Sequence, residues 1–156
     1  MSVDTQLPQS VEIIEITREL DIAAPIAITF EVMIEELGPL AEMMDGSKMP
    51  LKLEPWPGGR WFRDLGNDTG HLWGHVQVIK PPTLLEISGP MMMSYPATNH
   101  VQYRLTAQGN STHLTFAHRG IGLILPQHRE GMPKGWTFWL DKIRAGAEKK
   151  ATGPTT

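Results

Sequence analysis

The chain has 156 residues, a formal net charge of −3 at pH 7 and no cysteine. Because neither sign of charge dominates, the composition argues against broad electrostatic binding to nucleic acid or anionic lipid. Without cysteine, the chain has no disulfides, thiolate metal sites, iron–sulfur clusters or thiol nucleophiles.

The length fits a single domain, and residues 1–156 are predicted to form one. The first ten residues hold no basic region followed by an apolar stretch, and no later stretch approaches the roughly 20 apolar residues of a membrane span. We therefore expect a cytoplasmic protein without membrane insertion. Small, polar residues predict disordered tails at about residues 1–10 and 151–156.

Residues 11–23 open the predicted fold. Their second half alternates between apolar and polar side chains, which is the pattern of a half-buried strand. Pro25 suits the first turn of a helix, and apolar residues then recur at helical spacing until Gly38 and Pro39 end the element. A second short helix is predicted over residues 40–44.

Residues 51–120 are predicted to form five or six short strands separated by glycine- and proline-rich turns, in an antiparallel meander. Alternation places apolar residues on one shared face of this sheet. The residues expected on that face are Leu72, Gly74, Val76 and Val78, then Val101, Tyr103 and Leu105, then Leu114, Phe116 and His118.

The final helix is the element predicted to cover this face, and Pro133 is predicted to open it. Antiparallel strands with helices packed on one face make an α+β domain. The apolar stripe of the helix recurs at helical spacing and consists of Trp136, Leu140, Ile143 and Ala147, widened by Trp139.

Several segments carry a resemblance to a known family: residues 16–22 with Ala24 and Pro25, residues 58–61, residues 74–82 with Leu85, residues 112–118, and Gly135 and Trp136 with Leu140. In this order and spacing, they resemble the START/SRPBCC superfamily, and more closely its branch named after the activator of a heat-shock chaperone ATPase. The resemblance covers about residues 11–150. It implies an α+β helix-grip fold, in which a curved antiparallel sheet wraps around a long C-terminal helix and two short helices follow the first strand.

The resemblance also implies a cavity between the sheet and the last helix. Relatives with this fold carry lipids, bind hormones, cyclise polyketides or contact a chaperone, so the fold alone does not define a function. The branch provides no catalytic signature, and we assign no catalytic residue.

The six histidines invite comparison with metal sites. His71 and His75 lie four residues apart on a predicted strand. That spacing separates them by roughly 13 Å, too far to share one ion. We therefore predict neither a metal site nor a cofactor.

Two polar residues on the apolar face have alternative interpretations. His118 is either a core histidine with satisfied hydrogen bonds or a polar anchor for a ligand headgroup. The hydroxyl of Tyr103 reaches either a backbone carbonyl or a ligand. Trp61 and Phe62 are neighbours, so alternation sends one of them outside unless a bulge intervenes.

The nine methionines are many for a chain of this length, and most of them gather at residues 43–49 and 91–93. Thioether side chains are flexible and polarizable, so they suit apolar surfaces that accept more than one shape. The two groups either fill gaps in the core or form a pliable mouth to the cavity or a contact surface for a partner.

The leading prediction is non-catalytic binding of a small hydrophobic or amphipathic molecule between the sheet and the final helix. One alternative is a cyclase or dehydratase acting on a polyketide-like substrate, which lacks support from a paired acid and base. Another is a protein-interaction module that modulates a chaperone ATPase, and we expect a monomer or homodimer. The predicted ligand-binding residues are Leu72, Val76, Ile87, Met91, Met93, Val101, Tyr103, Phe116, His118, Trp136, Trp139 and Leu140.

Overall fold

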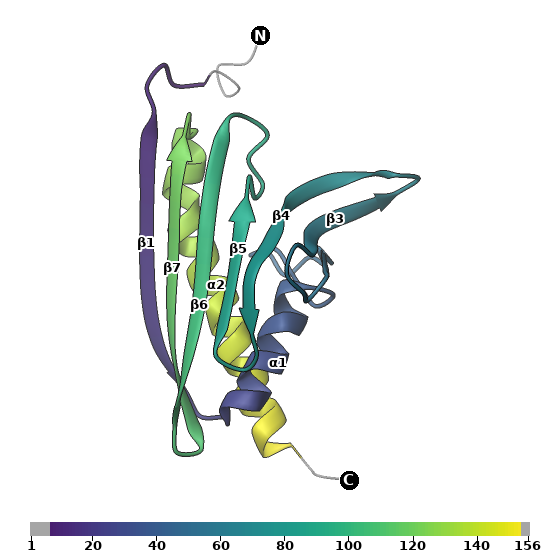
Figure 1. The fold of residues 1–156 in the computed structure, drawn as a ribbon, viewed down its shortest axis with the longest axis vertical. Helices are drawn as coiled ribbons and strands as arrows, with labels where there is room; N and C mark the ends of the chain where they lie inside the picture. The colour runs from purple at the N-terminus through teal and green to yellow at the C-terminus, as the bar shows by residue number, and fades with distance from the viewer. Residues whose placement is uncertain (1–6, 154–156) are drawn as a thin grey trace.

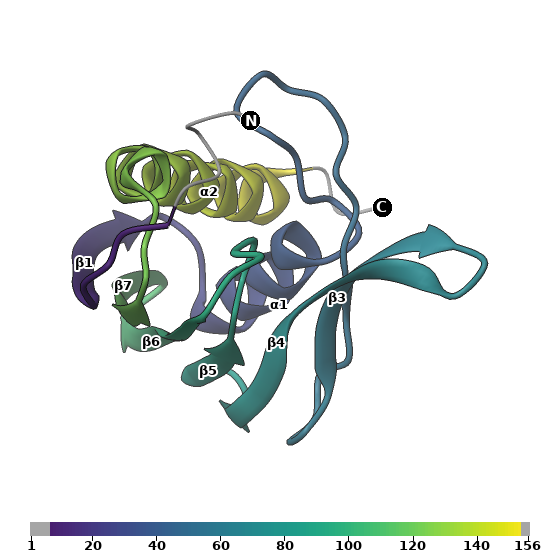
Figure 2. The same ribbon diagram turned by 90° about the horizontal axis from the view of Figure 1, so that it is seen from above.

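The computed structural model describes residues 7–153, whose strands form one seven-stranded antiparallel sheet with the order β1-β7-β6-β5-β4-β3-β2. Both helices lie against the same face of this curved sheet (Figure 1), and the view from above shows them side by side (Figure 2). This is the predicted α+β helix-grip fold. Neither helix in the described residues is long and apolar enough to cross a membrane. The elements are β1 (Glu12–Ile22), α1 (Ile26–Leu37), β2 (Lys52–Leu53), β3 (Arg60–Gly66), β4 (Thr69–Lys80), β5 (Leu84–Gly89), β6 (Ala97–Gln108), β7 (Ser111–Gly122) and α2 (Pro126–Thr152).

The helix α1 ends at Leu37, and the prediction of a second short helix over residues 40–44 is wrong. The chain forms a tight turn instead, in which the Asp45 carboxylate accepts a hydrogen bond from the backbone N–H of Ser47 at 2.9 Å. The N–H of Met43 then donates to the carbonyl of Ser47, also at 2.9 Å. These bonds pair the backbone N–H groups of Met43 and Ser47 within the turn, so a helix is not needed to provide their partners.

The helix α2 begins at Pro126 rather than at Pro133, which lies inside it. Proline is tolerated at the first position because the first turn of a helix has no internal partner for its missing N–H. The helix continues to Thr152, so the C-terminal tail was predicted to begin too early. The parts of the predicted tails at residues 1–6 and 154–156 lie outside the described residues.

A bulge interrupts the predicted alternation of β4. Trp61 of β3 pairs with Gly74 while Phe62 pairs with Leu72, which leaves Trp73 as the extra residue. Trp73 is therefore buried, whereas Leu72 is 46% exposed. The prediction that Leu72 belongs to the apolar face is wrong for this reason.

Trp61 and Phe62 lie on different sides of the sheet. Trp61 is fully buried, and its indole N–H donates to the carbonyl of Leu37 at 2.7 Å. Phe62 lies outside, where the guanidinium of Arg60 stands 4.6 Å from the centre of its ring. The same guanidinium binds the carboxylate of Glu54 at 2.8 Å, so Arg60 is a surface residue rather than an internal anion clamp.

The stripe predicted on α2 is buried against the sheet, with Leu140 only 3% exposed and Ile143 not at all. Aromatic rings occupy the space between helix and sheet. The ring centre of Phe116 lies 4.7 Å from that of Trp136 and 5.0 Å from that of Tyr103. The middle of the region predicted to be a cavity is therefore filled with side chains.

Candidate functional site

His118 lies in a hydrogen-bond chain inside the molecule, with none of its surface exposed. The indole N–H of Trp136 donates to its Nδ1 at 2.9 Å, and its Nε2 lies 2.7 Å from Oδ1 of Asn99. Because an indole N–H can only donate, Nδ1 is the acceptor and the ring proton is on Nε2. Burial lowers the pKa of His118 to about 4, so the ring is neutral at pH 7.

This chain of hydrogen bonds connects α2 to the centre of the sheet. The side-chain amide of Asn99 donates to the carbonyl of Gly89 at 3.2 Å. Gly120 leaves room for Asn99, since a Cβ at that position would lie 2.3 Å from its Oδ1. Both ring nitrogens of His118 are occupied by protein groups, which agrees with the interpretation of this residue as a satisfied core histidine.

Tyr103 is the other polar residue considered as an anchor. Its side chain is almost fully buried, and its hydroxyl has no hydrogen-bond partner among the described residues. Burial raises the pKa of the Tyr103 phenol, which is therefore un-ionised. Neither Tyr103 nor His118 lines the open groove that lies beside α2.

That groove has a volume of about 370 Å³ and opens between residues 42–49, the β5–β6 connection and the N-terminal half of α2. Six of the nine methionines line it, and we call it the methionine groove. Small-molecule sites commonly enclose about 300–1,000 Å³, so its size is sufficient. It is lined by Glu42, Met43, Met44, Met49, Trp73, Met91, Met92, Gln127, His128, Gly131, Met132, Gly135, Trp136 and Trp139.

Tryptophan rings form one wall of the methionine groove. Trp73 and Trp139 are nearly parallel, with ring centres 6.1 Å apart, and Trp136 meets Trp139 edge-on at 5.7 Å. Trp61 supports this wall from the core, with its ring centre 5.2 Å from that of Trp73 and 6.2 Å from that of Trp139. Edge-on and offset ring pairs have preferred geometries, so the wall is held in a defined shape.

The lining residues of α2, which include Trp136 and Trp139, recur at helical spacing, so one face of this helix lies along the groove. Gly131 and Gly135 lie on this face, and a Cβ added to either would meet no atom within 4 Å. Glycine inside a helix costs about 1 kcal/mol relative to alanine. At these two positions it leaves open the space that a larger side chain would occupy.

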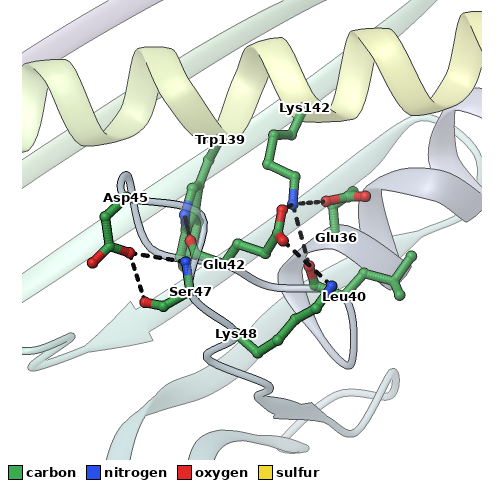
Figure 3. Close-up of polar contacts among 8 residues, drawn as sticks. All are labelled: Glu36, Leu40, Glu42, Asp45, Ser47, Lys48, Trp139 and Lys142. Carbon is green, nitrogen blue, oxygen red and sulfur yellow. Dashed lines mark hydrogen bonds and ion pairs between the residues drawn. The ribbon is translucent and has the colours of Figure 1, made fainter.

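The segment of residues 42–49, which supplies three of the lining methionines, is fastened to α2 (Figure 3). The indole N–H of Trp139 donates to the backbone carbonyl of Glu42 at 2.9 Å. The ammonium of Lys142 binds the Glu42 carboxylate and lies 3.1 Å from that of Glu36 (Figure 3). Methionine side chains are flexible, but the backbone that carries these three is anchored to α2.

The charges of this anchor reinforce one another. Burial alone would lower the pKa of Lys142, but its contacts with Glu42 and Glu36 raise that pKa. The hydrogen bond from Lys142, with a second one from Lys48, lowers the pKa of Glu42. The ammonium and the carboxylate of Glu42 are both ionised at neutral pH, which maintains the anchor.

Three of the predicted ligand-binding residues, Met91, Trp136 and Trp139, line the methionine groove. Leu72 lies on the exposed side of β4. The other predicted residues are buried and do not line the groove: Val76, Ile87, Met93, Val101, Tyr103, Phe116, His118 and Leu140.

Sequence reasoning missed several lining residues for identifiable reasons. Trp73 was missed because strict alternation placed its neighbours Leu72 and Gly74 on the apolar face, and the bulge in β4 breaks that alternation. His128, Gly131 and Met132 were missed because the helix was predicted to begin at Pro133. The clustering of methionines was the sequence signal at this place, and its two interpretations were gap-filling core and a pliable mouth or contact surface.

Within residues 7–153, no group of three or more His, Asp or Glu side chains is placed to hold a metal ion. The proposal that the protein works without a metal or cofactor stays a prediction. The chemistry that the groove offers is contact with apolar surface, supplemented by the polar groups of its rim.

A protein-family model described as "Activator of Hsp90 ATPase homolog 1-like protein" matches residues 28–148, a range that contains the whole lining of the groove. None of the curated proteins compared with the chain matches it. Among solved structures, an uncharacterized protein from Rhizobium leguminosarum is similar over 90% of this chain and 97% of its own, with a TM-score of 0.67 and 18% identity.

Two further solved structures have the same fold. A protein of unknown function from Staphylococcus aureus is similar over 92% of this chain and 98% of its own, with a TM-score of 0.66 and 12% identity. CalU16 from Micromonospora echinospora is similar over 91% of this chain and 88% of its own, with a TM-score of 0.58 and 19% identity. At such low identities, the similarity concerns the fold alone.

Proposed function

Because the chain belongs to the activator of Hsp90 ATPase homolog 1-like family, we propose that it uses the helix-grip fold to bind a small hydrophobic or amphipathic molecule in the methionine groove. The observation that carries this proposal is the lining of the groove, in which methionine and tryptophan side chains predominate. Such a surface gains free energy by removing apolar ligand area from water. Binding of this kind requires no catalytic residue.

The groove is a better ligand site than the interior because Phe116 and its neighbouring rings already fill the space between sheet and helix. The tryptophan wall supplies a defined shape, while the methionines adapt to ligands of different outline. We also propose that the protein binds its ligand in the cytoplasm, as a monomer or a homodimer.

The test uses a neutral, environment-sensitive dye, 6-propionyl-2-(dimethylamino)naphthalene. We expect binding at about micromolar concentration, quenching of tryptophan emission, and a melting temperature that rises with dye concentration. Gly135→Leu places a side chain in the open space and should weaken binding at least about tenfold. Lys134→Leu, at an exposed position outside the lining, is the matched control and should bind as the wild type does.

Equal dye affinity in Gly135→Leu and the wild type would show that the dye binds elsewhere. A melting temperature that falls with added dye would show that it prefers a loosened state, and would contradict a site on the native protein.

A second candidate function is docking of an apolar segment of a protein partner, in keeping with the chaperone-associated name of the family. The specific observation in its favour is the exposure of three methionines at the rim, Met43 by 48%, Met44 by 57% and Met92 by 39%. Methionine-rich surfaces suit the apolar face of an amphipathic helix. Stimulation of a purified chaperone ATPase that is lost in Met44→Glu would favour this candidate over small-molecule binding.

A further inference from the structure

A tyrosine–histidine pair stands at the rim of the methionine groove. Tyr95, in the β5–β6 connection, stacks on His128 of α2, with ring centres 5.6 Å apart and an angle of 16° between the planes. The hydroxyl of Tyr95 lies 2.7 Å from Nδ1 of His128. The backbone N–H of Leu125 donates to the same hydroxyl at 3.2 Å, so the pair is fixed to the start of α2.

These contacts favour one position for the proton of the imidazole. The hydroxyl of Tyr95 needs an acceptor for its own proton, and Nδ1 of His128 lies within hydrogen-bond distance of it. With Nδ1 accepting this bond, the proton of the neutral ring is on Nε2. Burial lowers the pKa of His128, which favours this neutral form at pH 7.

The charges around the groove restrict the ligands that it can accept. Glu42 is the single charged side chain of the lining, and the lining contains neither lysine nor arginine. The ammonium groups of Lys48 and Lys142, which approach the lining through Glu42, are paired with the carboxylate of that residue. An anionic headgroup would lose its hydration in the groove without gaining a cationic partner.

We propose that His128 is the polar anchor of the methionine groove, and that the groove selects uncharged apolar molecules with an acceptor oxygen, such as a ketone, which receives a hydrogen bond from Nε2–H. This inference rests on the proposed binding function and adds the orientation and chemical class of the ligand. His128 lines the groove, whereas both ring nitrogens of His118 are occupied within the core. The lining thus combines apolar walls with a few polar groups, among them the imidazole of His128, which Tyr95 holds in place, and this is the usual composition of a selective small-molecule site.

The experiment compares three molecules that share a naphthalene ring: 2-ethylnaphthalene, 2-acetylnaphthalene and 2-naphthoate. Their dissociation constants are measured from tryptophan quenching at pH 7.5. We expect the ketone to bind about three- to tenfold more tightly than the hydrocarbon, which corresponds to one net hydrogen bond. The carboxylate should bind most weakly of the three.

His128→Phe removes the donor and keeps an aromatic ring against Tyr95. In this variant the ratio of the dissociation constants of the ketone and the hydrocarbon should become about one, whatever change the new ring makes to the affinity for 2-ethylnaphthalene itself. The carbonyl stretch of bound 2-acetylnaphthalene gives a second readout. Hydrogen bonding lowers its frequency in the wild type, and the shift should be absent in His128→Phe.

The outcomes separate the two proposals. Equal affinities for the ketone and the hydrocarbon in the wild type, or a ketone preference that survives His128→Phe, would overturn the role of His128 but leave the binding function standing. Tightest binding of 2-naphthoate would overturn the predicted ligand class. Failure of all three molecules to bind the wild type would overturn both this inference and the proposed function.

Discussion

Protonation of His118 should destabilise the folded protein in mildly acidic solution. The pKa of His118 is about 4 in the folded state, compared with 6.5 for an unperturbed histidine. Between these two values the unfolded chain binds a proton that the folded chain does not, so the free energy of unfolding falls as the pH falls. The pKa of His118 is low because the charged ring would be buried. Protonation would also place a second N–H, at Nδ1, opposite the indole N–H of Trp136, which now donates to that nitrogen.

The difference between the two pKa values corresponds to about 3 kcal/mol once the pH is below both, and to about 2 kcal/mol of lost stability between pH 8 and pH 5. Other histidines titrate in the same range. Burial lowers the pKa of His128, which adds a loss of the same sign. Hydrogen bonds with Asp21 and Glu19 raise the pKa of His113, which opposes it, so the pH dependence of the wild type alone is not diagnostic.

The variant His118→Gln isolates the contribution because it is polar but does not titrate, while every other ionisable group is retained. Urea unfolding, followed by tryptophan emission at pH 8, 7, 6 and 5, measures the free energy of unfolding of both proteins. The wild type should lose about 2 kcal/mol more than the variant between pH 8 and pH 5. Parallel pH dependences of the two proteins would refute the assignment of His118 as a buried, neutral acceptor for Trp136.

Further predictions concern the helix face along the groove, the core behind it and the anchored segment of residues 42–49. Gly131→Ala adds a Cβ where no atom lies within 4 Å, so it should raise the free energy of unfolding by about 1 kcal/mol and the melting temperature by about 2–4 °C; a fall would mean that the space is not open. Leu140→Ala should lower the free energy of unfolding by about 2–5 kcal/mol in urea titrations, and an unchanged unfolding curve would contradict the packing of α2 on the sheet. Lys142→Met should speed hydrogen exchange of the amides in residues 42–49 without affecting those of α2, whereas unchanged exchange would show that the ion pair is not what anchors the segment.

The elements that were predicted correctly are those whose periodicity reports burial directly. The alternation of residues 11–23 yields β1, because one face of that strand packs on the core and the other meets solvent. The stripe from Trp136 to Ala147 yields the covering face of α2 for the same reason at helical spacing. The stripe of α2 is apolar throughout, whereas Arg18 interrupts the inward side of β1 between Ile16 and Leu20, but in both elements the period is clear.

The predictions that failed depend on interactions that no local pattern records. The turn formed by Asp45 and Ser47 replaces a helix through side-chain and backbone bonds within a few residues, although the residues before it are compatible with a helix. The bulge that buries Trp73 instead of Leu72 exists only in the pairing of two strands. Pro133 resembles a helix start because proline is favoured in a first turn, but it is also tolerated here inside a long helix held by the sheet.

The candidate site shows the same difference between features that a local sequence pattern indicates and features that depend on contacts in the folded structure. The methionine clusters were compatible with gap-filling core and with an adaptable apolar mouth, and the groove is lined by members of both clusters. The position of His128 depends on where α2 begins, and its orientation depends on Tyr95 from a distant connection. A pattern of residue types can therefore indicate that an apolar site exists, whereas the choice of polar anchor requires the three-dimensional contacts.

Trp136 explains why a filled interior and an open groove are compatible. Its indole N–H donates to His118 in the core, its ring contacts Phe116, and it also lines the methionine groove. The packed interior thus fixes one wall of the groove before any ligand arrives, and a ligand that binds there does not need to separate α2 from the sheet. The entropic cost of ordering falls mainly on the methionine side chains of the other wall, which is the arrangement expected of a site that keeps its position while accepting ligands of different shape.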